Sequence, residues 1–374
     1  MGDFLKLSEV CQKGNSNIAM KDLENYSGDY EIYGASGLIK KVDFYQRERP
    51  YIAIVKDGAG VGRVMKLPAK SSVIGTMQYI IPNEGIDVSF LAYALEHLNL
   101  AKYNTGATIP HIYFKDYCSE TIPAYSSNEQ KQIAGVLDRI SGLISLRKQQ
   151  LSKLDELVKS RFIELFGDPV DNPKNYLVKS LQELIDMGYI TYHLDGNHGG
   201  DYPRSEEFVD SGVPYIGANS IVNGKIDFSM AKFLTAERAG KLRKGIAQND
   251  DVLFAHNATV GPTVVLKTTE PKVILSTSLT AYRCDKSRLL PNYLKAYMQS
   301  DGFVRQYSGE MKQTTRNQVP ITAQKKYLFL VPPIVEQKQF AVFVEQTDKS
   351  KLAIQKSLEK LETLKKALMQ KYFG

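Results

Sequence analysis

A long internal repeat constrains the architecture of this 374-residue chain more than any other feature. Glu129-Gln130-Lys131-Gln132 opens a segment that closes at Phe166-Gly167. Glu336-Gln337-Lys338-Gln339 opens a second segment that closes at Phe373-Gly374, and the offset is 207 residues at both ends. A repeat of this length determines how a chain is organised. The sequence therefore predicts a globular domain followed by a long helix, twice over.

Apolar residues in each copy recur at alternating steps of three and four, the spacing of a coiled-coil seam. The seam positions are Ile133, Leu137, Ile140, Ile144, Leu151, Leu154, Val158 and Leu165, then Phe340, Val344, Ile354, Leu358, Leu361, Leu368 and Tyr372. Ser127 and Gln130 are predicted to form a capping box at the first helix start. At a rise of roughly 1.5 Å per residue, each helix would be about 60 Å long. One face of an ordinary core helix is the alternative, but two equal copies favour paired antiparallel spacer helices.

The repeat divides the chain into residues 1–126 (first domain), 127–167 (central helix), 168–333 (linker and second domain) and 334–374 (C-terminal helix). The two domains share an order of elements: strand, polar loop, returning strand and amphipathic helix. The matched segments are 51–55 and 251–255, 56–62 and 256–261, 63–65 and 263–266, 90–100 and 291–299, and 108–112 and 314–319. The predicted fold class is α/β (α+β), with two similar mixed domains, two long antiparallel helices and a pseudo-twofold internal repeat.

Composition bounds the function only loosely. The chain is 43% hydrophobic, and it has no apolar run of the roughly 18–20 residues that a membrane span needs. Its three cysteines are far apart, which fits reduced thiols in a cytoplasmic protein. The net charge is +7, with eight basic against three acidic residues over 40–70 and eleven against six over 225–288. Such excesses fit an anionic partner or solvated faces equally well.

The sequence offers no catalytic centre. Gly58-Ala59-Gly60-Val61-Gly62 lacks the spacing of a dinucleotide or Walker loop, so we interpret it as a structural turn. Asp168–Pro173 is a linker by its turn chemistry. His193 and His198 lie five residues apart in a polar loop and form no metal set.

Two diverged globules, each followed by a helix that opens with Glu-Gln-Lys-Gln and closes with Phe-Gly, resemble the specificity subunit of a type I restriction–modification enzyme. The resemblance covers essentially the whole chain, and its most specific parts are Thr108–Gly167 and Thr315–Gly374. Members of the family commonly begin each globule with a Trp, which this chain lacks. Phe4 and Tyr176 stand near those points, and we expect both to be packing aromatics.

The resemblance implies a non-catalytic subunit in which each domain reads one half of an asymmetric, gapped site in double-stranded DNA. The helices would act as a spacer between the half-sites. The implied partners are two methylase subunits, which would bind S-adenosylmethionine and methylate adenine N6. Up to two restriction subunits would bring ATP and Mg, so no cofactor is expected in this chain. A self-contained adenine methyltransferase is disfavoured by the missing motifs. A coiled-coil scaffold joining two modules that do not bind DNA remains an alternative.

Polar and basic loop residues at matched places in the two domains are the predicted DNA contacts. They are Tyr33, Ser36, Lys56, Arg63, Thr108, His111 and Lys115 in the first domain, and Asn219, Lys225, His256, Asn257, Thr259, Lys312, Thr315, Arg316 and Asn317 in the second. For any one of them, ordinary turn chemistry is an equal alternative. Apolar residues outside the seam exceed what two helices can bury, so they are predicted to bind the methylase. They are Val136, Leu157, Phe343, Leu352 and Leu364.

Overall fold

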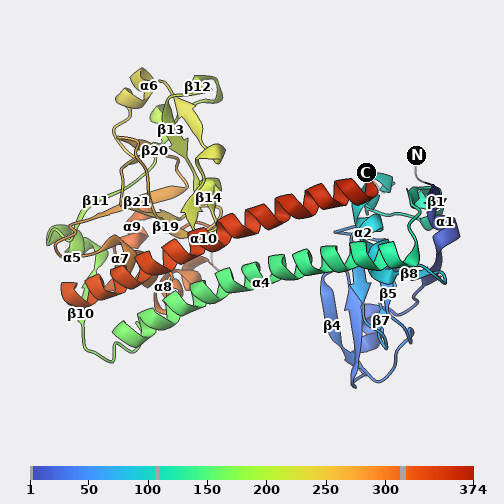
Figure 1. Ribbon diagram of the computed structural model, residues 1–374. Helices are drawn as coiled ribbons and strands as arrows, with labels where there is room; N and C mark the ends of the chain where they lie inside the picture. Colours follow the sequence, from blue (N-terminus) through green and yellow to red (C-terminus); the bar gives the residue numbers. More distant parts are fainter. Residues whose placement is uncertain (1–2, 106–108, 312–316) are drawn as a thin grey trace. The chain divides into compact units, whose positions relative to one another are not determined.

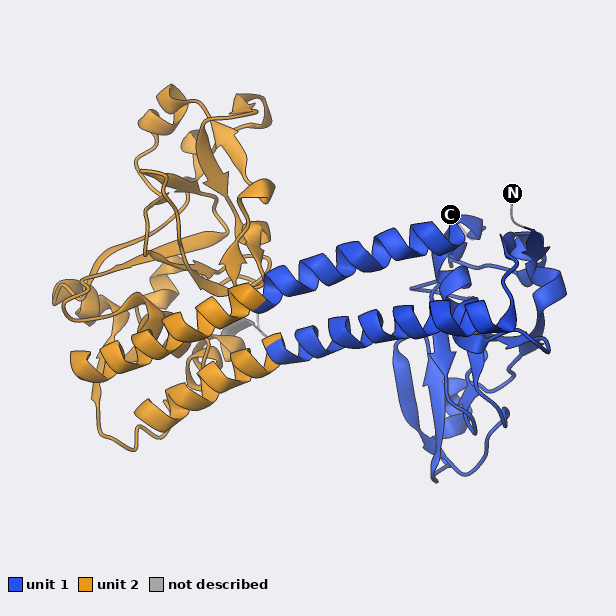
Figure 2. Ribbon diagram, in the orientation of Figure 1, with its two compact units in different colours: residues 1–150, 354–374 blue, residues 151–353 orange. Residues whose placement is uncertain are grey.

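The computed structural model describes residues 3–105, 109–311 and 317–374 of the chain (Figure 1). The chain forms two compact units (Figure 2): residues 1–150 with 354–374, and residues 151–353. Each long helix is divided between the two units, because the apolar residues at one end pack into the core of the first domain and those at the other end into the core of the second.

The first unit is built on a sheet with strand order β2-β8-β5-β6, beside a smaller sheet with order β4-β3-β7. Its elements are β1 Phe4–Lys6, α1 Leu7–Val10, β2 Cys11–Asn15, β3 Tyr30–Gly34, β4 Gly37–Val42, β5 Tyr51–Val55, β6 Val64–Leu67, β7 Ser72–Val73, β8 Met77–Pro82, α2 Val88–His97, α3 Phe114–Tyr117 and β9 Thr121–Pro123. The predicted strand 51–55, its returning strand and the helix after them are confirmed.

A central strand, β5, is buried on both faces. Its β-branched and aromatic side chains alternate between two cores, as a strand periodicity of two requires. Ile52 and Ile54 pack towards α2 and the long helices. Tyr51, Ala53 and Val55 pack towards the smaller sheet. The unit therefore has three layers: helices, main sheet and distal sheet.

The second unit repeats this plan, with a main sheet of order β11-β21-β18-β19 and a distal sheet of order β12-β16-β13-β20-β17. Its elements are β10 Leu177–Ser180, α5 Leu181–Asp186, β11 Ile190–Asp195, β12 Phe208–Val209, β13 Val213–Ile216, β14 Ile221–Val222, β15 Lys225–Ile226, β16 Lys232–Leu234, α6 Ala236–Lys241, β17 Ile246–Ala247, β18 Val252–Ala255, β19 Thr263–Val265, β20 Val273–Leu275, β21 Leu279–Cys284, α7 Pro291–Met298, α8 Asp301–Met311, α9 Ile321–Gln324 and β22 Leu328–Val331. Val252 and Phe254 of β18 face the helices, while Leu253 and Ala255 face the distal sheet.

The two long helices are α4, Ser127–Phe166, and α10, Ile334–Phe373. Every predicted seam residue is buried or half-buried. In the first unit, Lys148 Nζ lies 2.9 Å from a Glu362 carboxylate oxygen, while Ile133 shares a core with Phe373. In the second unit, Lys351 Nζ lies 2.5 Å from Asp155, and Phe166 packs on Phe340. The helices are therefore antiparallel in each unit, and the predicted fold class is confirmed.

The capping box of α4 begins one residue earlier than predicted. Ser126 N and Oγ donate to Glu129 Oε2 at 2.8 and 2.7 Å, so Ser126 and Glu129 form the box. Ser127 Oγ instead donates to Gly85 O, and Gln130 is buried. The prediction failed because Ser126-Ser127 and Glu129-Gln130 offer the same pattern in two registers.

Gln130 and Gln337 occupy the same place in the two copies of the repeat and do the same structural work. Gln130 Oε1 accepts from Asp87 N at the start of α2, and its Nε2 donates to Tyr125 O. Gln337 Oε1 accepts from Leu290 N at the start of α7. Each long helix is therefore hydrogen-bonded to the short helix of the domain that precedes it.

The far end of each helix completes the core of a domain. Phe166 lies 4.8 Å between ring centroids from Tyr293 of α7, and Phe373 lies 5.2 Å from Phe90 of α2. Tyr176 packs on Phe166 as predicted, with ring centroids 6.4 Å apart. The prediction for Phe4 is wrong: its side chain is 56% exposed, because β1 is a short edge strand paired only to β9. Within the described part of the chain, no helix is both long and apolar enough to span a membrane.

Candidate nucleic-acid interface

In each domain, the loop that follows the central strand is hydrogen-bonded to the segment before the last short helix. In the first domain, Gly58 N donates to Pro110 O at 2.8 Å and Ile112 N donates to Lys56 O at 3.0 Å. In the second, Ala258 N donates to Asn317 O at 2.9 Å and Val319 N donates to His256 O at 2.8 Å. We call each paired arrangement a loop clamp: residues 56–62 with 109–112, and residues 256–261 with 317–319.

Backbone conformation explains the glycines of the first loop clamp. Gly58, Gly60 and Gly62 all have positive φ, and Ala258 of the second clamp has φ 63°. A Cβ added at Gly62 would lie 2.4 Å from Ala101 N, so only glycine fits there. These residues turn the chain from β5 to β6, which confirms the structural interpretation of the glycine run.

The first loop clamp gathers a small polar cluster at the surface. Nδ1 of His111 contacts the carboxylate of Asp57, and Lys56 Nζ lies 3.8 Å from the same carboxylate. Lys115 Nζ stands 5.3 Å from the centre of the Tyr113 ring, whose centroid is 3.9 Å from that of His111. The half-exposed Tyr113 was not among the predicted contacts. Its position between two predicted polar residues was the available signal.

The turn between β3 and β4 is hydrogen-bonded to Arg63, the residue that directly follows the first loop clamp. Arg63 Nη1 donates to Ala35 O at 2.8 Å, which places the exposed Ser36 beside the first loop clamp. The hydroxyl of Tyr33 is less available for a contact with DNA, because it donates a hydrogen bond to the Glu31 carboxylate. Burial, with that hydrogen bond, raises the pKa of Tyr33 to about 12, so the phenol stays neutral.

The second loop clamp presents Asn257, Thr259 and Asn317 at or near the surface. Asn219 lies in a 3₁₀ turn, Ala218–Ser220, that is tied to the clamp through Ser278: Ala218 N donates to Ser278 Oγ, and His256 N donates to Ser278 O. Lys225 is exposed on the separate β14–β15 hairpin.

The prediction that His256 faces DNA is corrected by its burial. The side chain is 1% exposed, and Nδ1 lies 2.9 Å from Thr280 Oγ1 inside the domain. The reason is strand alternation: His256 continues the pairing of β18 with β21 and its side chain points into the core. Thr108, Lys312, Thr315 and Arg316 fall outside the described residues.

The exposed helix residues follow the repeat. Leu157 is 48% exposed in the second unit, and Leu364, at the same repeat position, is 47% exposed in the first. Leu352 is 47% exposed, whereas Val136 and Phe343 are partly covered. Arg161 lies over the Phe343 ring at 5.8 Å, which accounts for the cover at that position.

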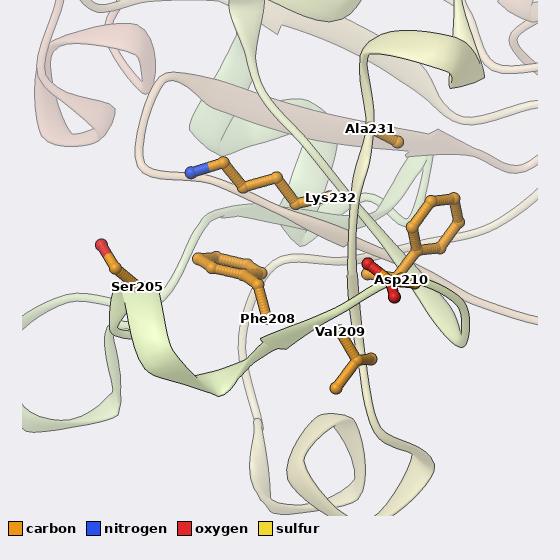
Figure 3. Close-up of a pocket in the computed structure, with 7 residues that line it drawn as sticks. Ser205, Phe208, Val209, Asp210, Ala231 and Lys232 are labelled. Atoms are coloured by element: carbon orange, nitrogen blue, oxygen red, sulfur yellow. The ribbon is translucent and has the colours of Figure 1, made fainter.

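A shallow cavity of about 430 Å³ is lined by residues in and beside the paired strands β12 and β16 of the distal sheet, and no loop-clamp residue lines it (Figure 3). Its lining residues are Ser205, Phe208, Val209, Asp210, Ala231, Lys232 and Phe233. Lys232 Nζ stands 4.7 Å from the centre of the Phe208 ring, so its ammonium group makes a cation–π contact within the cavity lining. Across residues 3–105, 109–311 and 317–374, no three His, Cys, Asp or Glu side chains gather as a metal site.

Comparison with known proteins agrees with the division into two repeats of a domain and a long helix. The family profile described as "Type I restriction modification DNA specificity domain" matches residues 3–156 and 173–366, one match for each domain and the helix after it. The chain therefore belongs to the type I restriction–modification DNA specificity family.

Two specificity subunits are distant relatives, one matching almost the whole chain and the other about half of it. The MjaVIII specificity subunit of a type I restriction enzyme from Methanocaldococcus jannaschii is 24% identical, over 99% of this chain and 90% of the relative. The MjaIX specificity subunit from the same organism is 24% identical over 55% of this chain and 51% of the relative.

Solved structures share the fold. The S subunit of a type I restriction–modification system from M. genitalium has a TM-score of 0.65 at 16% identity, covering 100% of this chain and 96% of that one. A chain from a type I system studied for its complex assembly has a TM-score of 0.52 at 16% identity, covering 99% and 97%.

Proposed function

We propose that this chain is the DNA sequence-recognition subunit of a type I restriction–modification complex, in which each domain reads one half of an asymmetric, gapped site. The observation that carries the proposal is the loop clamp, which has the same backbone hydrogen bonds in both domains but different side chains. Asp57 and His111 face each other in the first clamp, and Asn257 and Gln318 do so in the second.

Base readout explains why a common scaffold would carry different side chains. Contacts to phosphate position a protein on DNA, whereas hydrogen bonds to base edges specify the sequence. Asn and Gln pair well with adenine, while Lys and Arg pair well with guanine. The two clamps are therefore expected to prefer different base pairs, which would make the complete site asymmetric.

The proposed contacts are the surface residues of each clamp and its neighbours. They are Tyr33, Ser36, Lys56, Arg63, His111 and Lys115 in the first domain, and Asn219, Lys225, Asn257, Thr259 and Asn317 in the second. Thr108, Lys312, Thr315 and Arg316 remain proposals from the sequence alone. Tyr113, which is 50% exposed, joins the set because of its place beside His111.

Catalysis is proposed to reside in partner subunits. The methylase would bind S-adenosylmethionine and methylate adenine N6, and restriction subunits, where present, would supply cleavage with ATP and Mg. This chain would determine which DNA sequence the complex modifies. The exposed Leu157 and Leu364 support two methylase subunits, because the repeat places the same apolar residue once in each unit.

The docking part of this proposal can be tested with charge substitutions. We expect Leu157→Glu or Leu364→Glu to release one methylase each, and the double variant to release both, as measured by native mass of the purified complex. Lys159→Glu and Lys366→Glu are matched controls, because these residues are exposed, lie at equivalent repeat positions and stand two residues after each leucine, on another side of the helix. Full assembly of the double leucine variant would contradict the docking face.

The recognition part is tested by mapping modified adenines genome-wide in cells that express this chain with its methylase. We expect one motif with two short, different half-sites around a fixed gap. Asn317→Ala should relax one half-site only and His111→Ala the other, each by the roughly 1–3 kcal/mol of a base contact. An assembled complex with an intact methylase that leaves no motif and has no affinity for DNA would favour the scaffold alternative.

A further inference from the structure

Beneath the second loop clamp lies a chain of hydrogen-bonded side chains that links three strands of the main sheet to the clamp. Its members are His193 on β11, Thr280 and Tyr282 on β21, Gln324 on α9, and His256 at the end of β18. All five side chains are buried, and Tyr282, Thr280 and Gln324 are 0% exposed. None of them can touch a ligand at the surface.

Gln324 is the branching point of this buried chain. Its Oε1 accepts from Tyr282 Oη at 2.6 Å and lies 3.1 Å from His193 Nε2. Its Nε2 donates to Thr280 Oγ1 and to Val319 O, both at 3.1 Å. Both amide hydrogens are therefore used, and the geometry fixes the orientation of the amide.

The hydroxyl of Thr280 connects Gln324 to His256 through hydrogen bonds. Thr280 Oγ1 accepts from Gln324, so its own hydrogen is free to point at His256 Nδ1, 2.9 Å away. This direction requires a neutral imidazole with Nδ1 as the acceptor. Burial lowers the pKa of His256, which keeps the ring in that neutral form.

The buried chain meets the loop clamp at two of its backbone groups. Gln324 holds Val319 O, while Val319 N donates to His256 O at 2.8 Å. His256 is followed directly by Asn257, Ala258 and Thr259, the surface part of the clamp. The positive φ of Ala258 is a conformation that needs support from its surroundings.

In the described part of the first domain, the matching positions hold a buried pair of side chains in place of this longer chain. By strand register, Gln78 stands where Thr280 does and Ile80 where Tyr282 does. Tyr117 matches Gln324 at the repeat offset and makes a single bond, from its Oη to Gln78 Oε1 at 2.9 Å. The first loop clamp is instead tied at the surface, through Asp57 and His111.

We propose that His256, Thr280 and Gln324 are positioning residues that hold the Asn257–Thr259 loop from below and thereby set which base pairs the second domain accepts. The inference rests on the proposed function, and it assigns half-site selectivity to residues that do not contact DNA. It also predicts that the two domains differ: selectivity of the first half-site should not depend on the buried chain.

The test is the adenine map of the assembled complex with Thr280→Val, which keeps the shape of the side chain but removes its hydroxyl. The substitution removes both hydrogen bonds of the hydroxyl, to Gln324 and to His256, and we expect discrimination within one half-site to fall about tenfold. It should be the half-site that Asn317→Ala relaxes. Thr280→Ser, which keeps the hydroxyl, should restore the wild-type motif. Thr191→Val is the matched control, because Thr191 is exposed on the neighbouring strand.

The outcomes separate the inference from a structural role. An unchanged motif overturns it, and so does equal loss in both half-sites together with a lower melting temperature. If Thr280→Val does not fold, Tyr282→Phe removes only one hydroxyl at the far end of the chain and should relax the same half-site more weakly. A wild-type complex without any gapped motif would instead defeat the proposed function, whatever the variants do.

Discussion

Replacing the buried glutamine of the repeat should disrupt one domain at a defined place. Gln337 is 0% exposed and makes three hydrogen bonds: Oε1 accepts from Leu290 N at 2.8 Å, and Nε2 donates to Arg288 O at 3.1 Å and to Pro332 O at 2.8 Å. Gln337→Leu keeps the volume of the side chain but leaves these three backbone groups without their partner.

The magnitude follows from the number of groups left unpaired. A buried N–H or C=O without a partner costs about 1–3 kcal/mol, so three should cost roughly 3–5 kcal/mol once partial relaxation is allowed. Gln130→Leu removes two such bonds, to Asp87 N and Tyr125 O, and should cost roughly 2–4 kcal/mol in the first domain.

Urea unfolding gives the free energy of unfolding, and hydrogen exchange of the Leu290 and Asp87 amides locates the damage. Gln339→Leu and Gln132→Leu are the controls: both residues are exposed, two positions further along the same helices, and should stay within about 0.5 kcal/mol. The reasoning would be refuted by a loss below about 1 kcal/mol for Gln337→Leu with unchanged exchange at Leu290.

Two further predictions concern the ends of the helices and the buried histidine. Phe166→Ala should destabilise the second domain by about 3–5 kcal/mol, and Phe373→Ala should destabilise the first domain by less, because Phe166 is 1% exposed and Phe373 is 9% exposed. Hydrogen exchange resolved by domain measures both effects. Loss of protection only in the domain that precedes each helix in the sequence would contradict the packing. Burial lowers the pKa of His193 from 6.5 to about 4, so the unfolded state binds a proton first as the pH falls. The free energy of unfolding of the second domain should therefore decline by roughly 3 kcal/mol from pH 6.5 to 4 and level off below. His193→Gln should reduce that decline, and an identical pH profile for the variant would argue against it.

Local pattern was enough to predict many elements. The repeat gave both long helices, and the β-branched run 51–55 with its matched segment gave the two central strands. The matched loops were found as well, because their polar residues break strand periodicity at equivalent places. The prediction of Ser127 as the cap failed because two overlapping registers satisfy the same local rule, and only the hydrogen bonds of the folded chain distinguish them.

The loops of the candidate interface were predicted from the sequence, but the directions in which their side chains point were not. His256 reads as a loop residue beside Asn257 and Thr259, yet it points into the core while its neighbours face outwards. Nothing in the local sequence shows that Thr280 and Gln324 would meet it, since they come from 24 and 68 residues further along the chain. Tyr113 was missed for a similar reason, because its contact with His111 becomes visible only when the clamp is formed.

The amino-acid sequence was sufficient to show that the chain repeats, that each repeat ends in a long amphipathic helix, and that matched loops carry different side chains. These features follow from periodicity and spacing, which are local properties of the backbone. The folded chain was needed to show that the two copies of the buried glutamine are hydrogen-bonded to the starts of α2 and α7, that Phe373 packs into the core of the first domain, and that His256 lies beneath its loop. Burial and hydrogen bonding depend on partners far away in sequence, and those partners come together only in the folded chain.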